Sequence, residues 1–359
     1  MERGIQQQLV SLGQVITVLS VKLSLAILTS IRKRRNREIA MYTVVEREIR
    51  GRRRGPYVWE RQRQHDFWEV IVEGHFTAGL WLQHFRMIKP TFVMLCNAIG
   101  PFVGPKQSPG RRPISTEKRI AIALYKLATC AEYRVVGETF GVSKTSVHRC
   151  VYAVCRAIRY KLLAKFVKIP NVAEAQAIAH RNSMKHQVPQ VYGALDGTHI
   201  PILPPSDGYR DYVNRKGWPS IVLQALVDDR YQIIDICVGS PGSAHDAAVF
   251  TMSNLYRFPE RHPQANADVE GVQVPLLIAG DPAYPLMPWL MKGFSGPNLS
   301  EEQEAFNFQL SAIRVKVEHT FGHLKGRWRI LAKWSDVHHS FMPTVVVACC
   351  VLHNICEKE

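Results

Sequence analysis

The sequence lacks the cysteine spacing of a disulfide framework or a zinc site. Its eight cysteines contain no Cys-x-x-Cys and no paired spacing, which is typical of reduced, mostly buried thiols in an intracellular protein. Cys349, Cys350 and His353 could be imagined as zinc ligands. They lie in an apolar run with helical character, so we expect them to pack in the core instead.

Acidic residues are scarce in the first half of the chain. Residues 1–190 hold 32 Lys and Arg but only 12 Asp and Glu, a net charge of +20, whereas residues 191–359 hold 14 and 18, a net charge of −4; together these give the +16 of the whole chain. This division suggests that the basic half binds a polyanion while the acidic half supplies metal ligands. The alternative is a basic tail that only aids solubility.

No long apolar run is free of polar residues. The segment 9–28 is mostly apolar and a basic cluster follows it at 31–37, as in a signal anchor, but Lys22 falls inside the run. An interior Lys costs roughly 2.5–3.5 kcal/mol on insertion. We therefore expect no membrane anchor, although cell fractionation would test that alternative, and we assign the cluster to nuclear entry or phosphate contact.

The 359 residues suffice for two domains, or for one large domain with a helical attachment. We divide the chain into a basic, peripheral segment at 1–55, a helical region at 56–185 and an α/β domain at 190–356. No internal repeat or low-complexity tract interrupts this division.

Residues 114–160 predict a helix-turn-helix-like DNA-binding block. Ser115 or Thr116 can cap a helix at 117–130, a second helix would cover 132–140, and after Gly141 a third, capped by Ser143, would run to about residue 160. The last helix would enter the major groove. We expect Lys144, Thr145, His148 and Arg149 to face DNA and Val147, Val151 and Val154 to pack inward. A plain helical bundle is the alternative.

The second half favours strands at 191–195, 200–203, 221–227, 233–238 and 276–279, followed by helices at 303–328 and 343–356. Four acidic residues stand in or beside these apolar runs, namely Asp196, Asp246, Asp281 and Glu318. Ionised carboxylates in such surroundings are costly unless they bind a cation. Mg²⁺ prefers oxygen ligands and keeps positions for water and phosphate.

The pattern of these acids predicts metal-dependent cleavage of a phosphodiester. Asp196 and Asp281 would end strands, Asp246 would open a helix, and Glu318 would lie within one, an arrangement suited to two cations about 4 Å apart. Lys325 and Arg327, further along the helix of Glu318, could hold the phosphate backbone. Each acid alone could equally be a turn former, a helix cap or half of an ion pair with Arg314. Their joint occurrence favours function.

Several motifs resemble those of the PIF/Harbinger transposase superfamily. They are LDGTHI at 195–200, YVNRKG at 212–217, GSAHDAAVF at 242–250, GDPAY at 280–284, RVKVEHTFGHLKGRW at 314–328 and ACCVLHNI at 348–355. The likeness covers about 190–356, and more loosely 80–160. It is strongest to the Harbinger transposase-derived nucleases of animals.

The resemblance implies an RNase H-like α/β fold, a mixed sheet flanked by helices, with a DDE-type metal site. Asp196, Asp246, Asp281 and Glu318 would be metal ligands. The catalytic triad would be Asp196, Glu318 and one of the two middle aspartates, of which we favour Asp281. The stretch containing Tyr212, Asn214, Arg215 and Lys216 would either contact DNA ends or form a hairpin turn.

We therefore predict a Mg²⁺- or Mn²⁺-dependent nuclease derived from a transposase. The alternative is a domesticated DNA-binding or chromatin protein that does not cleave. We also expect a nuclear protein, with a cytoplasmic pool, that binds DNA, a Myb-like DNA-binding protein and further copies of itself.

Overall fold

The computed structural model describes residues 29–30, 32–33, 66–105 and 113–358. The apolar segment 9–28, most of the predicted peripheral segment 1–55 and the second basic cluster lie outside these residues. All described residues from 66 onward belong to one compact unit.

The first part of this unit is helical. It consists of α2 (Asp66–Val72), α3 (Ala78–Phe85), α4 (Lys89–Val103), α5 (Thr116–Thr129), α6 (Tyr133–Thr139) and α7 (Lys144–Phe166). Ser115 accepts a hydrogen bond from the Lys118 amide and Ser143 from the Ser146 amide, so the caps of α5 and α7 are confirmed. The third helix continues past residue 160 to Phe166, because its buried side extends to Leu162.

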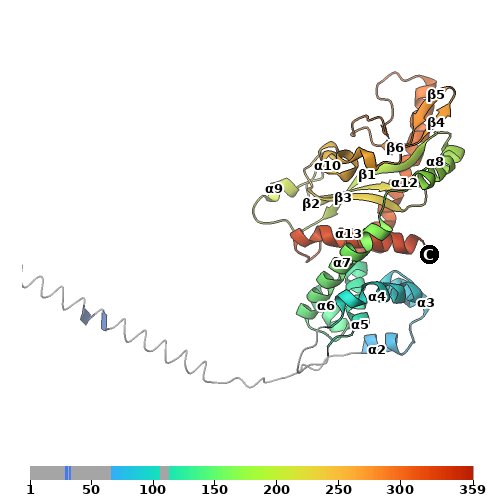
Figure 1. Cartoon of the computed structure of the whole chain (residues 1–359). Coiled ribbons are helices and arrows are strands. Elements are labelled where there is room, and N and C mark those ends of the chain that lie inside the picture. Colours follow the sequence, from blue (N-terminus) through green and yellow to red (C-terminus); the bar gives the residue numbers. More distant parts are fainter. Residues whose placement is uncertain (1–28, 31, 34–65, 106–112, 359) are drawn as a thin grey trace, which may run out of the picture. The chain divides into compact units, whose positions relative to one another are not determined.

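The second part begins with α8 (Val172–His186) and contains a five-stranded sheet. Its strands are β1 (Val191–Pro201), β2 (Ser220–Val227), β3 (Ile233–Pro241), β6 (Leu277–Gly280) and β7 (Leu290–Met291), in the spatial order β3-β2-β1-β6-β7. The pairs β1–β2 and β2–β3 are antiparallel, whereas β6 runs parallel to both β1 and β7. This mixed sheet confirms the RNase H-like fold (Figure 1).

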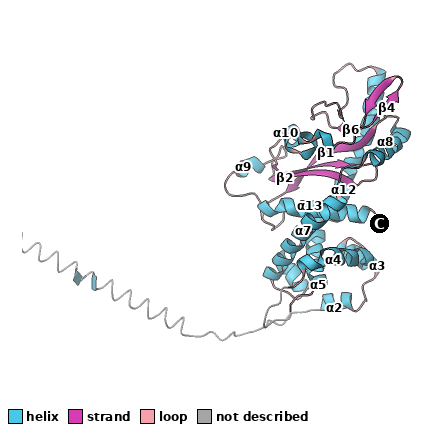
Figure 2. Ribbon diagram, viewed as in Figure 1, coloured by secondary structure: helices cyan, strands magenta, loops and turns pink. Residues whose placement is uncertain are grey.

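The sheet is covered by helices on both sides (Figure 2). One face packs Tyr192, Leu195 and Leu226 against α8 and against α10 (Asp246–Met252) and α11 (Asn254–Arg257). The other face packs Ala194, Leu223 and Ala225 against α12 (Glu301–Arg327) and α13 (Met342–Glu357). The remaining elements of the second part are short. They are α9 (Tyr209–Tyr212), η1 (Pro259–Arg261), η2 (Arg329–Leu331), η3 (His339–Phe341) and a hairpin of β4 (Asn266–Val269) and β5 (Val272–Pro275).

Helix α13 connects the two parts of the unit. It contacts α7 on one side and β3 on the other, and Figure 1 shows it between the sheet and the helical region. Cys349, Cys350 and His353 are fully buried in this helix, which confirms that they pack in the core. Among the described residues, one stretch, His339–Glu357, is long and apolar enough to cross a membrane, and 78% of it is buried inside the protein.

Candidate active site

Asp196 lies in the middle of a strand, and the expectation that it ends one is wrong. Strand β1 runs without a break from Val191 to Pro201 where two separate strands were predicted. It pairs with β2 from Ala194–Val227 to Pro201–Ser220, with Asp196 opposite Ala225. The continuous ladder satisfies the backbone of residues 196–199, and this outweighs the turn preference of an Asp-Gly pair.

The alternation of β1 turns Asp196 toward helix α12. Successive side chains of a strand point to opposite faces, so Asp196 shares its face with Ala194 and Thr198. Ala194 belongs to the core that includes α12, and the Thr198 hydroxyl accepts a hydrogen bond of 2.7 Å from Lys325 on that helix. The carboxylate of Asp196 therefore points into the space between the sheet and α12.

Asp281 reaches the same space from the neighbouring strand. It directly follows β6, as predicted, and the last residue of that strand, Gly280, pairs with Leu195 of β1. Arg314 of α12 donates a hydrogen bond of 2.7 Å to the Asp281 carboxylate. Since the Arg314 guanidinium is largely buried and its Nε has no acceptor, this contact fixes Asp281 against the helix.

Asp246 approaches β1 from the opposite face. It opens α10, as predicted, and one of its carboxylate oxygens would lie 2.9 Å from a Cβ atom at Gly197. The side of β1 that Gly197 presents is the one away from Asp196. A glycine is therefore required at 197 for Asp246 to come this close, and Arg215 flanks the same carboxylate at 3.8 Å.

Burial and the two neighbouring aspartates raise the pKa of Asp196. The pKa of Asp196 is raised to about 6, first by burial and further by the nearby Asp281 and Asp246 carboxylates. The Gly197 amide and the Arg314 guanidinium act in the opposite direction. A site with this balance favours a bound proton or cation over an exposed negative charge.

Glu318 lies on α12 with an exposed side chain. It follows Arg314 by one helical turn and precedes Lys325 by two, so all three lie along one side of the helix. Arg314 contacts Asp281 and Lys325 contacts β1. Glu318 thus lies on the side of α12 that makes these two contacts, with its own side chain exposed.

The donor set suits a hard cation, although its side chains are not gathered around one point. Among the described residues, no three His, Cys, Asp or Glu side chains stand close enough together to hold a metal ion. Two of the carboxylates are paired with arginines instead: Asp281 binds Arg314, and Asp246 faces Arg215. A buried carboxylate with a raised pKa, close to two further carboxylates, fits the oxygen preference of Mg²⁺ or Mn²⁺.

The predicted DNA-facing residues of the helix-turn-helix lie together at the start of α7. Lys144, Thr145, His148 and Arg149 are exposed, while Val147, Val151 and Val154 are fully buried, as expected. The turn is tight, since a Cβ at Gly137 of α6 would lie 2.8 Å from the Val142 carbonyl oxygen. His148 also stacks on Tyr152, with ring centroids 4.0 Å apart.

Lys325 and Arg327 are engaged within the protein. Lys325 donates to the Thr198 hydroxyl and the His199 carbonyl, and burial lowers its pKa to about 8. Arg327 donates a hydrogen bond of 2.8 Å to Glu357 of α13. Both side chains join α12 to neighbouring elements, and their contact with a phosphate backbone stays a prediction.

The stretch at 212–217 contains one buried and two exposed functional candidates. Asn214 is 4% exposed, accepts hydrogen bonds from the Lys216 and Trp218 amides, and donates to Ser220, which in turn bonds His199. This polar network beside Asp246 was not anticipated, because residues 199, 214 and 220 show no common spacing. Arg215 and Lys216 are exposed around it.

Comparison with known proteins places these residues in two matched regions. The DDE superfamily endonuclease family matches residues 195–354, and a domain of unknown function (DUF8040) matches residues 60–160. "Protein ALP1-like" of Arabidopsis thaliana is 27% identical over 290 residues, covering 76% of this chain and 69% of that protein. No solved structure matches the chain.

Two further relatives have informative names. "Antagonist of like heterochromatin protein 1" of Arabidopsis thaliana is 27% identical over 283 residues, covering 76% of this chain and 71% of that protein. "Putative nuclease HARBI1" of Homo sapiens is 29% identical over 251 residues, covering 68% of each chain.

Proposed function

Because residues 195–354 are a DDE superfamily endonuclease domain related to the Harbinger transposase-derived nucleases, we propose that this protein is a metal-dependent nuclease that cleaves the phosphodiester bonds of DNA. The observation that carries the proposal is the cluster around β1. Asp196, with its pKa raised to about 6, lies between Asp281 and Asp246. Helix α12, which packs beside this strand, carries Glu318 on the same side as Arg314 and Lys325.

Asp196, Asp281 and Glu318 are the residues that would hold the metal on the α12 side, with Asp246 adding charge from the other face. When bound, Mg²⁺ or Mn²⁺ would activate the attacking water and stabilise the leaving oxygen. Arg314 bonds one carboxylate oxygen of Asp281, and this hydrogen bond would hold the carboxylate in place as a metal ligand.

The geometry supports Asp281 over Asp246 as the second member of the triad. Asp281 and Asp196 both face α12, where Glu318 lies, whereas Asp246 contacts the side of β1 that Gly197 presents. A single ion held between strand and helix needs ligands on one face. Asp246 then acts through charge, next to Arg215.

Nicking of supercoiled DNA in Mn²⁺ tests this assignment. We expect Asp281→Asn to lower the rate by at least about 100-fold, because it removes a ligand of the catalytic charge cluster. Asp246→Asn, its matched control in chemistry, should cost about tenfold or less. A greater loss from Asp246→Asn than from Asp281→Asn would reverse the roles of the two aspartates.

We propose that the protein contacts DNA at two sites. The exposed residues at the start of α7 would contact the major groove, and Arg215 with Lys216 would contact the phosphates nearest the cleavage site. The basic balance of residues 1–190 supports this division, since duplex DNA is a dense polyanion.

A chromatin or DNA-binding protein without cleavage is the second candidate. The absence of a ready-made three-carboxylate group among the described residues favours it, as does the name of the relative that antagonises a heterochromatin protein. The test is to mix the protein with terminal-repeat DNA in Mn²⁺, with a Myb-like partner protein also supplied. If the protein binds this DNA and leaves it intact, the DNA-binding function takes the place of the nuclease.

We further propose that the protein is nuclear with a cytoplasmic pool and forms homo-oligomers, since two DNA ends have to be handled together. Imaging of a fluorescent fusion and light scattering of the purified chain test these two points. A single-copy mass with DNA bound would contradict the second.

A further inference from the structure

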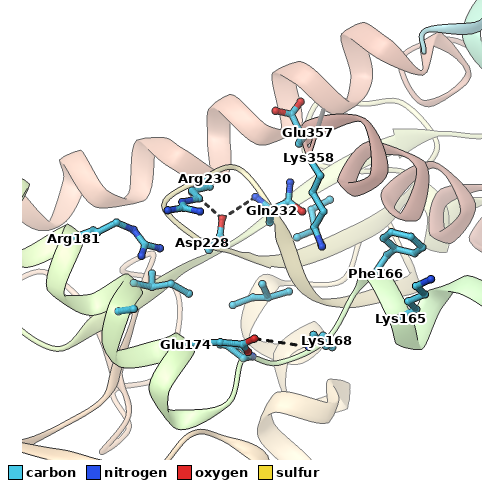
Figure 3. A pocket seen from close by; sticks show the side chains of 15 residues that line it. Lys165, Phe166, Lys168, Glu174, Arg181, Asp228, Arg230, Gln232, Glu357 and Lys358 are labelled. Carbon is cyan, nitrogen blue, oxygen red and sulfur yellow. Dashed lines mark hydrogen bonds and ion pairs between the residues drawn. The ribbon is translucent and has the colours of Figure 1, made fainter. Parts of the chain in front are cut away.

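A cavity of about 550 Å³ lies away from the four carboxylates, and its lining contains none of them (Figure 3). It is bounded by the end of α7, by α8, by the β2–β3 turn and by the end of α13. The register of β1 and β2 sets its position. Asp196 is opposite Ala225, whereas Val227 and the following Asp228 lie toward the beginning of β1.

The acidic residues that line this cavity are already satisfied. Asp228 accepts hydrogen bonds from the Arg230 and Gln232 amides, and Glu357 accepts one from Arg327. Glu174 caps α8 through the Asn171 amide. None of these acids needs a further cation.

The cations around the cavity are in excess. Arg181 is held by Asp229 through two hydrogen bonds, and Lys168 is 4.0 Å from Glu174. Lys165, Arg230 and Lys358 also line the cavity, and none of the ion pairs formed within the described residues includes them. The uncompensated charge of the cavity is therefore positive.

The remaining surface is apolar with one unsatisfied acceptor. Ile178, Ile233 and Ile234 form the apolar part, and the Phe166 ring lies 5.5 Å from the Lys165 ammonium and 5.6 Å from that of Lys358. The side-chain oxygen of Gln232 is buried and accepts no hydrogen bond. A ligand that matches the cavity would carry negative charge, apolar bulk and an N–H donor.

We propose that this cavity binds an acidic peptide segment of a partner protein, in which carboxylates flank apolar side chains. Figure 3 shows Arg230 on one side of the cavity and Lys165 with Lys358 on the other. Cations separated in this way suit charges spread along an extended chain, whereas a phosphate group needs donors that converge on one point. The backbone amides of the peptide supply the donor that Gln232 lacks.

Peptide selection tests the proposal and does not require that the partner protein be identified first. A displayed library of random dodecapeptides is selected on the full-length protein and counter-selected on Ala177→Trp, which fills the cavity from α8. We expect enriched peptides with Asp or Glu on both sides of Leu, Ile, Val or Phe. Failure to enrich, or enrichment of basic or uncharged sequences, overturns the proposal.

Labelled enriched peptides then give affinities by fluorescence anisotropy. Ala177→Trp and the pair Lys165→Glu with Lys358→Glu should each weaken binding about tenfold or more, since attraction becomes repulsion. The matched controls are Ala173→Trp and the pair Lys89→Glu with Lys185→Glu, which are exposed residues outside the cavity. Equal losses in cavity variants and controls contradict the proposal.

A labelled single-stranded oligonucleotide distinguishes the other class of anion. If Ala177→Trp abolishes oligonucleotide binding and leaves peptide binding intact, the cavity is a nucleic-acid site and the proposal fails. Nuclease activity of Ala177→Trp should equal that of the unaltered protein. The outcome for the cavity is thus separate from the outcome for the carboxylates.

Discussion

At the scale of one residue, the ionised carboxyl of Asp196 lowers the stability of the fold. The carboxyl is buried in a strand next to two other carboxyls, and its folded pKa of about 6 lies above the ordinary value of 3.8. The proton-bound form therefore contributes stability that is complete below about pH 4 and is lost as the pH rises through 6.

Replacing Asp196 by Asn should stabilise the metal-free protein at pH 8. The amide keeps the shape and the acceptor for the Gly197 amide but carries no charge, so a gain of about 3 kcal/mol follows from the rise of the Asp196 pKa from 3.8 to about 6. Urea unfolding in EDTA measures it. At pH 4 the two proteins should agree, and an equal gain at both pH values would show that charge is not the cause.

The sequence could single out four candidate acids, but it could not predict their mutual arrangement. Motifs indicate which carboxylates belong together. The face on which each one lies depends on the unbroken course of β1 and on the contact between Asp246 and Gly197. The pairing of Arg314 with Asp281 joins residues 33 positions apart, and no local pattern indicates such a pair.

At the scale of elements, Lys126 joins α5 to the segment before α13. Its side chain is completely buried, forms an ion pair with Asp336, and donates a hydrogen bond of 2.7 Å to the Ala131 carbonyl. Asp336 also accepts from the Tyr133 amide at the start of α6. One carboxylate thus holds two helices of the helix-turn-helix-like block.

Removal of that carboxylate should be costly. Asp336→Ala leaves the Lys126 ammonium buried without its partner, and we expect a loss of about 3 kcal/mol in the free energy of unfolding. Chemical denaturation measures this change. The double variant Lys126→Met with Asp336→Ala should recover much of the loss, and the idea fails if it is no more stable than the single variant.

The start of α7 should contribute to DNA affinity by charge. Lys144→Ala with Arg149→Ala should weaken duplex binding about tenfold and reduce the slope of log affinity against log salt concentration by about 2. Anisotropy titrations at several salt concentrations give both values. Lys185→Ala, an exposed change on α8, is the control, and an equal effect of this change would argue against a defined DNA-binding face.

The elements differ in how well the sequence predicts them. Ser115 and Ser143 are local signals, and the helices that they cap begin as expected. The hairpin β4–β5 and the two-residue strand β7 were not predicted, because strands this short depend on their partners. The continuity of β1 likewise comes from β2.

At the scale of the whole molecule, one core joins the basic helical region to the nuclease-like domain. Helix α13 contacts both α7 and β3, so a DNA duplex bound at α7 would be held at a fixed distance from the carboxylates. The apolar run at 343–356 predicted that this helix would be buried. The elements that the helix packs against depend on tertiary packing, and the sequence did not indicate them.

The most direct test of the central claim is cleavage of supercoiled and terminal-repeat DNA in Mn²⁺ or Mg²⁺, with EDTA as the metal-free control. We expect the unaltered protein to nick the DNA only with metal, and Asp196→Asn and Glu318→Gln each to lower the rate by at least about 100-fold. Cleavage that survives in both variants, or intact DNA despite binding, would contradict the account.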